Sequence, residues 1–507
     1  MHARPVSSVL QPALTMLQLP QCLCSTFETA PHSAMQKPSK PHKPQQLFEI
    51  LAQQILSGVY REGEKLPSLR SLARQSDVSK NSVVSAFEML VARGLVEPRR
   101  GSGFYVRAIA PDERVPQAAS QQKVHAMNIV WLLQTQLAVQ PGQLAVGDAF
   151  MPPESMEKLR IDRYYPKIAR SGIRSMSRYG DRLGYLALRR VLARNLTTAG
   201  LACEPDHIML THGANEAMEL LVRYGVSQGH TVLTDEPGYY PLIAKLKMAN
   251  ANVVGIERQP DGPCLQALEQ AIVRWRPRLF FTQSAMQNPT GSFYSETKAR
   301  QVVALCAAHN VLVVDNDSLS GLYDGPTSKL AQTDQLHSTV HVGSFSKTIS
   351  PALRVGFLVA APALVDALAD IRTLLNISSA EYCERTVEAI IEDPSYERFL
   401  QRQRSDLRRA TAAAQDKLRQ WGAEVFCDYR QSLFLWARFP EADNSLELAR
   451  ALQIENVMLA PGALFSVDFS QPSAWSRCNP FALADPRFDT ALRAVRNRVA
   501  RGRSSAV

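Results

Sequence analysis

The segment GSFSKTISPALRVG, residues 343–356, brings together side chains that could bind a phosphorylated aldehyde. The amine of Lys347 can form a Schiff base with a carbonyl carbon. The hydroxyls of Ser344 and Ser346 flank this lysine, and the guanidinium of Arg354 follows. Hydroxyls and a guanidinium are suited to holding a phosphate dianion. By itself the segment is equally consistent with an exposed lysine among serines, so the chemistry depends on residues elsewhere in the chain.

Three residues that follow predicted strands could contact the ring of such a compound. Asp315 could pair with a pyridine nitrogen, keep it protonated and make the ring an electron sink. Asn288, in the turn NPTG, could offer its amide to a ring hydroxyl, and Tyr239 could stack on the ring. Open α/β sheets bind ligands at the carboxyl ends of their strands, so we expect these residues to share one site with Lys347.

A phosphate site is also predicted where the segment THGAN, residues 211–215, leads into a helix. Backbone N–H groups at Ala214 and Asn215 would bind an anion at the positive end of the helix dipole. An aldehyde, a phosphate and a pyridine ring occur together in pyridoxal 5'-phosphate, which is therefore the cofactor that we expect. We expect no metal, because no pair of the eight cysteines has the spacing of a zinc site.

The elements that must position these residues follow from a second pattern. From residue 146 onward, β-branched runs alternate with amphipathic stretches, and the runs include 231–234, 279–282, 311–314 and 340–343. This alternation predicts an α/β domain with a mainly parallel sheet.

Residues 45–107 have a different pattern, which predicts three short helices and a hairpin. Ser68 and Ser79 are good N-caps for the second and third helices. Two short helices around a tight turn form a helix-turn-helix, whose second helix can enter the DNA major groove. We expect four residues of the last helix to face inward: Val83, Phe87, Leu90 and Val91.

The start of the last helix and the hairpin tip carry residues suited to DNA. The hairpin GLVEPRRGSGFYV, residues 94–106, has a basic, glycine-rich tip typical of a wing. Small or long polar and basic side chains contact phosphates and base edges. The residues that we expect to do so here are Ser79, Lys80, Asn81, Ser82, Arg99 and Arg100.

Positive charge is concentrated in the same part of the chain. Residues 1–110 contain 13 Lys or Arg and 7 Asp or Glu, and they carry +6 of the formal net charge of +10. A basic segment on a nearly neutral body indicates a polyanion partner. No apolar run approaches the length that spans a bilayer, and neither a signal peptide nor a disulfide framework is indicated. We expect a cytoplasmic protein with no membrane partner.

The pattern divides the chain into four parts. We expect a flexible tail over 1–44, a DNA-binding domain over 45–107, a linker over 108–145 and a cofactor-binding α/β domain over 146–500. Because patterned sequence begins only at Gln45, either Met1 or Met35 could be the natural start.

The motifs KLPSLR, VSKNSVVSAFEMLVARGLV and RRGSGFYV, in this order, resemble the winged helix-turn-helix of the GntR family of bacterial transcription regulators over residues 45–107. In that family the arginine of the PSLR segment, the start of the third helix and the wing glycine contact DNA. The resemblance therefore implies that Arg70 and Gly103 belong to the DNA interface together with Ser79 to Ser82.

Residues 146–500 resemble the fold-type I pyridoxal-phosphate enzymes of the aminotransferase class I/II type, which carry a smaller C-terminal α+β subdomain. The resemblance implies that Lys347 forms the Schiff base and that Asp315 pairs with the pyridine nitrogen. It places Asn288 near the phenolic oxygen and Tyr239 on the ring. The phosphate would be held by Ala214, Asn215, Ser344, Ser346 and Arg354. Tyr179 matches a tyrosine that reaches the neighbouring subunit's phosphate, and Arg477 matches the arginine that binds the substrate or effector carboxylate.

A winged helix before such a domain is the layout of the MocR subgroup of GntR regulators. This resemblance implies a head-to-tail homodimer that binds double-stranded operator DNA. It would sense an amine, an amino acid or pyridoxal phosphate itself, with at most weak transamination. Two alternatives stay open: a working aminotransferase with an accessory DNA-binding domain, and a DNA-binding regulator whose large domain is a cofactor-free dimerisation scaffold.

One position departs from the family pattern. Family members place a tyrosine two or three residues after the ring-nitrogen aspartate, hydrogen-bonded to the cofactor's phenolic oxygen. This chain has Asp317 and Ser318 there. A carboxylate that points inward would repel a phenolate and raise the pKa of the imine.

Overall fold

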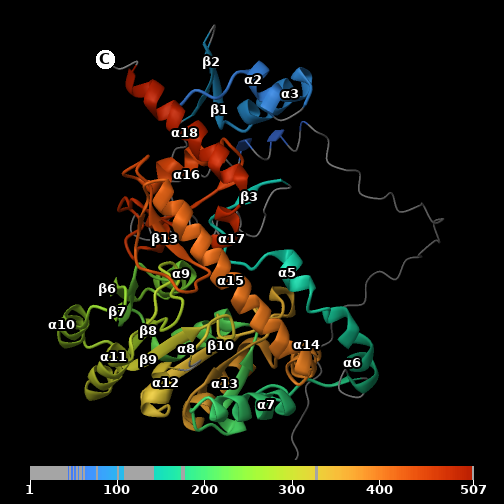
Figure 1. The fold of residues 1–507 in the computed structure, drawn as a ribbon, viewed down its shortest axis with the longest axis vertical. Helices are drawn as coiled ribbons and strands as arrows, with labels where there is room; N and C mark the ends of the chain where they lie inside the picture. The colour runs from blue at the N-terminus through green and yellow to red at the C-terminus, as the bar shows by residue number, and fades with distance from the viewer. Residues whose placement is uncertain are drawn as a thin grey trace, which may run out of the picture. The chain divides into compact units, whose positions relative to one another are not determined.

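The computed structural model describes residues 142–172, 177–325 and 329–504, together with 63–75, 78–99, 102–107 and single positions between 44 and 60. The chain forms two compact units, Met1–Ile109 and Ala110–Val507 (Figure 1). No helix in the described ranges is long and apolar enough to cross a membrane. The expected tail and most of the expected linker lie outside the described residues.

The smaller unit contains the helices α2 (Leu69–Gln75) and α3 (Lys80–Ala92). Each begins after the serine predicted to cap it. Ser68 Oγ and Ser79 Oγ each accept a hydrogen bond from the backbone N–H three residues later, at 3.2 and 3.1 Å. These bonds satisfy N–H groups that have no partner inside the helix, which is why the helices start there.

A hairpin of β1 (Val96–Arg99) and β2 (Gly103–Val106) follows α3, as predicted. Its side chains pack on α3: the rings of Phe87 and Phe104 lie edge-on with centroids 4.7 Å apart. Residues of the first predicted helix complete this core: Leu47, Phe48, Leu51, Ala52 and Ile55.

The expected inward face of α3 is correct except at one position. Val83, Phe87 and Leu90 are buried, but Val91 is only half-buried. At 3.6 residues per turn, Val91 lies about 80° around the helix from Val83, at the edge of the apolar face.

The larger unit is built on an eight-stranded sheet with the order β4-β11-β10-β9-β8-β5-β6-β7. The pairs β5–β6, β5–β8, β8–β9 and β9–β10 are parallel, which confirms the mainly parallel sheet. The strands are β4 (Ile208–Thr211), β5 (Thr231–Glu236), β6 (Asn252–Gln259), β7 (Gly262–Pro263), β8 (Leu279–Thr282), β9 (Leu312–Asp317), β10 (Thr339–Ser344) and β11 (Gly356–Val359).

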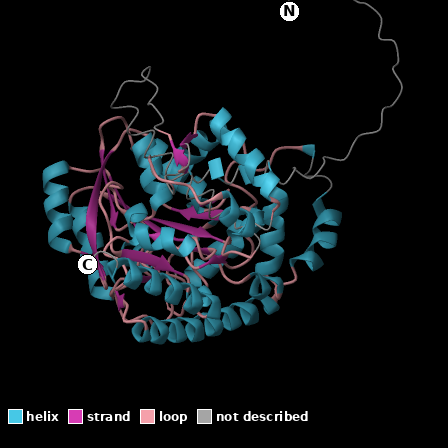
Figure 2. Ribbon diagram, turned by 90° about the horizontal axis from the view of Figure 1, so that it is seen from above, coloured by secondary structure: helices cyan, strands magenta, loops and turns pink. Residues whose placement is uncertain are grey.

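Helices cover both faces of this sheet, as Figure 2 shows. The neighbouring residues Val313 and Val314 of β9 belong to different core clusters, because successive side chains of a strand point to opposite faces. The helices of this part, which we call the large lobe, are α7 (Leu186–Thr198), α8 (Ala214–Gly225), α9 (Tyr240–Met248), α10 (Leu265–Trp275), α11 (Glu296–Ala308), α12 (Lys329–Asp334), α13 (Pro362–Asn376) and α14 (Glu381–Ile391).

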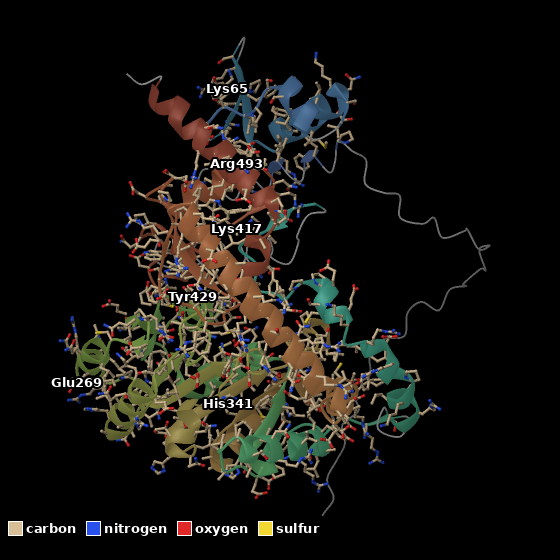
Figure 3. All side chains as sticks on the ribbon, in the orientation of Figure 1. Lys65, Glu269, His341, Lys417, Tyr429 and Arg493 are labelled. Carbon is tan, nitrogen blue, oxygen red and sulfur yellow. The ribbon has the colours of Figure 1, made fainter. Side chains whose placement is uncertain are left out.

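A second sheet, with the order β12-β13-β16-β15, forms the core of a small lobe. Its strands are β12 (Glu424–Val425), β13 (Leu435–Arg438), β15 (Ala460–Pro461) and β16 (Trp475–Cys478), and its helices are α15 (Pro394–Gln420), α16 (Ser445–Gln453), α17 (Pro480–Leu483) and α18 (Pro486–Ser504). The Tyr429 hydroxyl (Figure 3) donates to the Thr290 carbonyl of the large lobe at 2.7 Å.

The chain reaches the large lobe through a short strand and two helices. These elements are β3 (Leu144–Ala145), α5 (Pro153–Glu157) and α6 (Tyr165–Gly172). β3 pairs in parallel with β14 (Val457–Met458). Leu144 and Ala145, expected at the end of a linker, are therefore part of the folded larger unit.

Replacing Phe87 by alanine should destabilise the smaller unit, because it leaves a cavity beneath the hairpin. We expect its free energy of unfolding to fall by about 3–5 kcal/mol. The loss can be measured by urea unfolding of the full chain, with proteolysis of the N-terminal unit as the signal for its unfolding. The control is Glu88→Ala on the exposed side of the same helix. Equal losses for the two variants would contradict the packing described here.

Candidate functional site

Lys347 lies in the loop after β10, with its Nζ 3.2 Å from the centroid of the Phe150 ring. Burial lowers the pKa of this amine to about 7. The charge of Asp148 opposes the shift, while the charges of Arg477 and Arg354 add to it. A neutral amine is the nucleophilic form of lysine, so this shift favours attack by Lys347 on a carbonyl near neutral pH.

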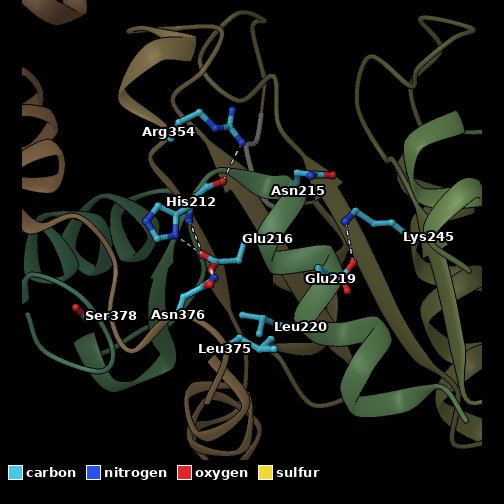
Figure 4. A pocket seen from close by; sticks show the side chains of 10 residues that line it. All are labelled: His212, Asn215, Glu216, Glu219, Leu220, Lys245, Arg354, Leu375, Asn376 and Ser378. Carbon is cyan, nitrogen blue, oxygen red and sulfur yellow. Dashed lines mark hydrogen bonds and ion pairs between the residues drawn. The ribbon is translucent and has the colours of Figure 1, made fainter. Parts of the chain in front are cut away.

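The residues predicted to hold a phosphate come from two segments that the fold brings together. Arg354 donates from Nη2 to the His212 carbonyl at 2.9 Å, in the turn before α8 (Figure 4). Asn215, at the start of that helix, lines the same cavity of about 600 Å³ as Arg354. The Ser344 hydroxyl donates to the Ser346 hydroxyl at 3.2 Å. Two hydroxyls, a guanidinium and a helix N-terminus therefore belong to adjoining segments.

The turn before α8 requires glycine at 213. Gly213 has a φ of 74°, and a Cβ added there would lie 2.9 Å from Arg354 Nη2. The turn is also held by Glu216, which accepts hydrogen bonds from the His212 N–H at 2.6 Å and from Asn376 at 2.7 Å. Burial alone would raise the pKa of Glu216, but the hydrogen bonds outweigh it and hold this pKa at about 2.

Asp315 is 1% exposed and points to Ser284. Its two oxygens accept hydrogen bonds from the Ser284 N–H at 2.9 Å and the Ser284 hydroxyl at 2.6 Å. Burial raises the pKa of Asp315 to about 6 in spite of these bonds. The strand does not end at Asp315 as expected: β9 continues to Asp317, because its parallel partner β10 extends beside it as far as Gly343.

A buried ion pair fixes the segment that carries both Ser284 and Asn288. Arg258 donates to Asp235 at 3.3 Å, to the Gln283 carbonyl at 2.9 Å and to the Ser292 hydroxyl. Gln283 in turn accepts a hydrogen bond from the Asn288 N–H at 2.9 Å.

Arg477, on β16 of the small lobe, reaches the large lobe. Its guanidinium donates to Asn288 Oδ1 at 2.9 Å and to the Gly147 carbonyl at 2.6 Å, and its Nε has no hydrogen-bond partner among the described residues. It lies 5.3 and 5.1 Å from the ring centroids of Phe434 and Phe465. Burial lowers the pKa of Arg477. A buried cation bonded to neutral oxygens is suited to binding an anion.

Several residues that contact this group were missed by the sequence analysis. Asp148 lies between Gly147, which contacts Arg477, and Phe150, which contacts Lys347. The Asn479 side chain donates to the Phe150 carbonyl at 2.8 Å. No motif of the sequence marks these contacts, because they join segments that lie far apart in the chain. The described residues contain no cluster of three or more His, Cys, Asp or Glu that could hold a metal.

The other two predicted residues of this site differ in their surroundings. Tyr239 is partly buried at the start of α9, and burial raises the pKa of its hydroxyl. Tyr179 is 77% exposed, so the fold of a single chain does not bring it into the group around Lys347.

The predicted DNA-contacting residues lie in the smaller unit. Lys80 and Asn81 are exposed at the start of α3, next to the cap Ser79. Arg99 donates to Glu97 at 2.9 Å and lies over the Tyr105 ring. Its positive charge is therefore partly compensated by contacts inside the hairpin. Ser82 is half-buried and Gly103 exposed, while Arg100 and the Arg70 side chain lie outside the described residues.

The larger unit has the fold of the pyridoxal-phosphate-dependent aminotransferases, and the comparisons identify both units. Residues 143–495 match the family of aminotransferase class I and II, and residues 43–106 match the bacterial regulatory proteins of the gntR family. The chain belongs to the aminotransferase class I and II family. With its GntR helix-turn-helix unit it has the architecture of the MocR-type transcription regulators.

Proteins named as helix-turn-helix transcriptional regulators are similar over most of the chain. The helix-turn-helix transcriptional regulator YdcR of Escherichia coli K12 is 28% identical, over 86% of this chain and 93% of its own length. The regulator YjiR of the same organism is 25% identical, over 83% of this chain and 91% of its own length. The regulator NorG of Staphylococcus aureus USA300 is 23% identical, over 66% of this chain and 77% of its own length.

Solved aminotransferases share the fold of the larger unit. The α-aminoadipate aminotransferase LysN of Thermus thermophilus, solved with N-(5'-phosphopyridoxyl)-L-leucine, has a TM-score of 0.67 at 22% identity and covers 76% of this chain and 99% of its own. The kynurenine aminotransferase of Pyrococcus horikoshii has a TM-score of 0.64 at 17% identity and covers 77% and 94%.

Replacing Arg258 by methionine should destabilise the protein strongly, because it leaves Asp235 buried and unpaired. We expect the free energy of unfolding to fall by about 3–5 kcal/mol, and Asp235→Asn in the same chain to restore part of it. The free energy of unfolding of both variants can be measured by urea denaturation monitored by circular dichroism. The control is Arg300→Met, which removes an exposed pair with Glu296. A loss at Arg258 no larger than at Arg300 would contradict the role of the buried pair.

Proposed function

We propose that this protein is a transcription regulator that binds double-stranded DNA through residues 45–107 and pyridoxal 5'-phosphate through Lys347, and that it senses an amine, an amino acid or the cofactor itself. The observation that carries the proposal is the position of Lys347 in the loop after β10, against Phe150 and in the field of the buried cation Arg477, in a chain whose residues 43–106 match the GntR family.

The DNA-binding part of the proposal is supported by the start of α3. Lys80 and Asn81 are exposed there, and the first turn carries no acidic residue that would repel phosphates. A helix-turn-helix reads the major groove with this end of its second helix. We propose contacts to phosphates and base edges from Arg70, Ser79, Lys80, Asn81, Ser82, Arg99, Arg100 and Gly103.

The residues present in the larger unit fit the cofactor. When bound, it would supply an aldehyde and an electron-withdrawing ring. Lys347 would hold it covalently, Asp315 would keep a proton on its ring nitrogen, and Asn288 would lie near its phenolic oxygen. Tyr239 would stack on the ring. The phosphate would be bound by Ala214, Asn215, Ser344, Ser346 and Arg354.

The same geometry supports an amino acid as the effector. Its carboxylate would pair with Arg477, and its amine would displace Lys347 from the cofactor. We further propose a head-to-tail homodimer in which the exposed Tyr179 reaches the phosphate of the partner subunit. An effector regulates only if it binds the two states of this dimer with different affinity, and those states must differ in the arrangement of the DNA-binding units.

A working aminotransferase is the second candidate, and the complete set of Lys347, Asp315 and Arg477 favours it. Steady conversion of an amino acid in the presence of a keto acid would establish it. Effector-dependent DNA binding without turnover would establish the regulator.

Lys347→Ala should abolish the visible imine band of protein mixed with pyridoxal phosphate while leaving the protein folded, and Lys298→Ala should keep the band. Because the neutral amine attacks the aldehyde, the rate of band formation should rise as the pH passes about 7 and level off above it. With an exposed lysine, the rate of band formation would continue to rise until about pH 10. A wild-type protein without a band would favour the cofactor-free scaffold.

Arg70→Ala and Lys80→Ala should each weaken binding to a mixed-sequence duplex at low salt and leave the imine band intact. If Lys80 contacts one phosphate, its loss should reduce the slope of log K against log salt by about 0.9. Arg498→Ala removes the same charge from an exposed pair with Glu455 in the larger unit and serves as the control. Equal effects of Lys80→Ala and Arg498→Ala would contradict a specific role for α3.

A further inference from the structure

A second buried carboxyl group lies two residues beyond Asp315 on β9. The Asp317 side chain is 1% exposed, and it lies on the same face of the strand as Asp315, since side chains alternate with a period of two. The Cα atoms of these two residues thus lie about 6.6 Å apart along one strand face. This part of β9 is at the edge of the sheet where Lys347 follows β10.

The two carboxyl groups differ in how completely they are hydrogen-bonded. Both oxygens of Asp315 accept bonds from Ser284. Asp317 Oδ2 accepts a bond from the Tyr323 hydroxyl at 2.7 Å, but its Oδ1 is buried and has no partner among the described residues. A buried polar atom in this condition is rare in folded proteins and indicates a missing water, ion or ligand.

The surroundings of Asp317 favour a neutral acid. Burial raises its pKa well above the usual range, and the charge of Asp315 raises it further, whereas the bond from Tyr323 lowers it. Asp315 and Tyr323 are the titratable groups that act on Asp317, and no cationic side chain among the described residues opposes them. Because Oδ2 already accepts from Tyr323, the proton of the neutral acid belongs on Oδ1. Oδ1 is then a buried donor without an acceptor.

We propose that Asp317 is a protonated acid whose Oδ1 donates a hydrogen bond to the phenolic oxygen of pyridoxal phosphate. This inference rests on the proposed binding of that cofactor at Lys347. Asp315 would serve the ring nitrogen, and the acid two residues along the same strand face would serve a second polar atom of the same ring. Asp317 is then a cofactor-binding residue at the position where this chain departs from the family pattern.

This assignment reverses the effect expected from the sequence. A charged carboxylate would repel the phenolate and raise the pKa of the Schiff-base nitrogen. A neutral acid withdraws negative charge from the phenolate through its hydrogen bond, so the phenolate holds the Schiff-base proton less strongly. Asp317 therefore lowers this pKa, and the sign of the effect separates the two states of the side chain.

The test is a pH titration of the visible imine band of the cofactor-loaded protein, with Asp317→Ala and Asp317→Asn beside the wild type. The alanine variant loses the donor, and its midpoint should rise by about one pH unit, the usual strength of a hydrogen bond to a charged group. The asparagine variant keeps a donor of similar shape, so its midpoint should stay close to that of the wild type.

A lower midpoint in both variants, as expected when a negative charge is removed, would overturn the inference, and so would an unchanged midpoint in the alanine variant. Should Asp317→Ala fail to fold by circular dichroism, Asp317→Leu removes the donor with little change of volume, and its midpoint should rise in the same way; an unchanged or lowered midpoint in that variant contradicts the neutral acid. A wild-type protein with no imine band would overturn the proposed cofactor binding and this inference together. A band with midpoints shifted in the wrong direction would overturn only the inference.

Discussion

The guanidinium of Arg477 is the contact on which the larger unit's site depends. From a strand of the small lobe it donates to Asn288 of the large lobe and to Gly147 in the segment that leads into that lobe. Transferring a cation out of water costs several kcal/mol, and neutral carbonyl oxygens and aromatic faces compensate for it only in part. The same side chain therefore contributes both to the position of the lobes and to the electrostatics of the site.

The charge of Arg477 also affects the pKa of neighbouring groups. Together with burial and Arg354 it lowers the pKa of Lys347, while Asp148 opposes it from the segment between Gly147 and Phe150. Burial has the opposite effect on the acidic residues at the same sheet edge, because it raises their pKa. The pKa of Asp315 is raised to about 6. The edge can be both polar and buried because the fixed segment after β8 supplies Ser284 as a hydrogen-bond donor.

Local features of the structure could be predicted from the sequence because they depend on neighbouring residues. Ser68 and Ser79 cap the helices that follow them, and β-branched runs became β5, β8, β9 and β10. The β-branched run 311–314 predicted a strand that ends before Asp315, yet β9 continues to Asp317. The cause is the ladder with β10, which a local pattern does not contain.

Contacts between distant segments could not be predicted in this way. Ser284 pairs with a residue 31 positions away, and Phe150 meets Lys347 across almost two hundred residues. Neither side chain has an unusual type or spacing. Asp317 is a similar case: its position was noticed because of the family pattern, but its pKa is raised by burial and by the charge of Asp315 and lowered by the bond from Tyr323.

The hydrogen bond from Arg354 to the His212 carbonyl has a consequence for ligand retention. A flexible arginine loses rotational freedom when it binds a ligand, which costs about 0.5–1.5 kcal/mol for each immobilised side chain. Here the turn orders the guanidinium before any phosphate arrives, and Gly213 leaves it the space to lie there. The entropy of holding Arg354 is thus lost during folding rather than during binding, so a phosphate would be retained at lower free concentration than by a mobile arginine.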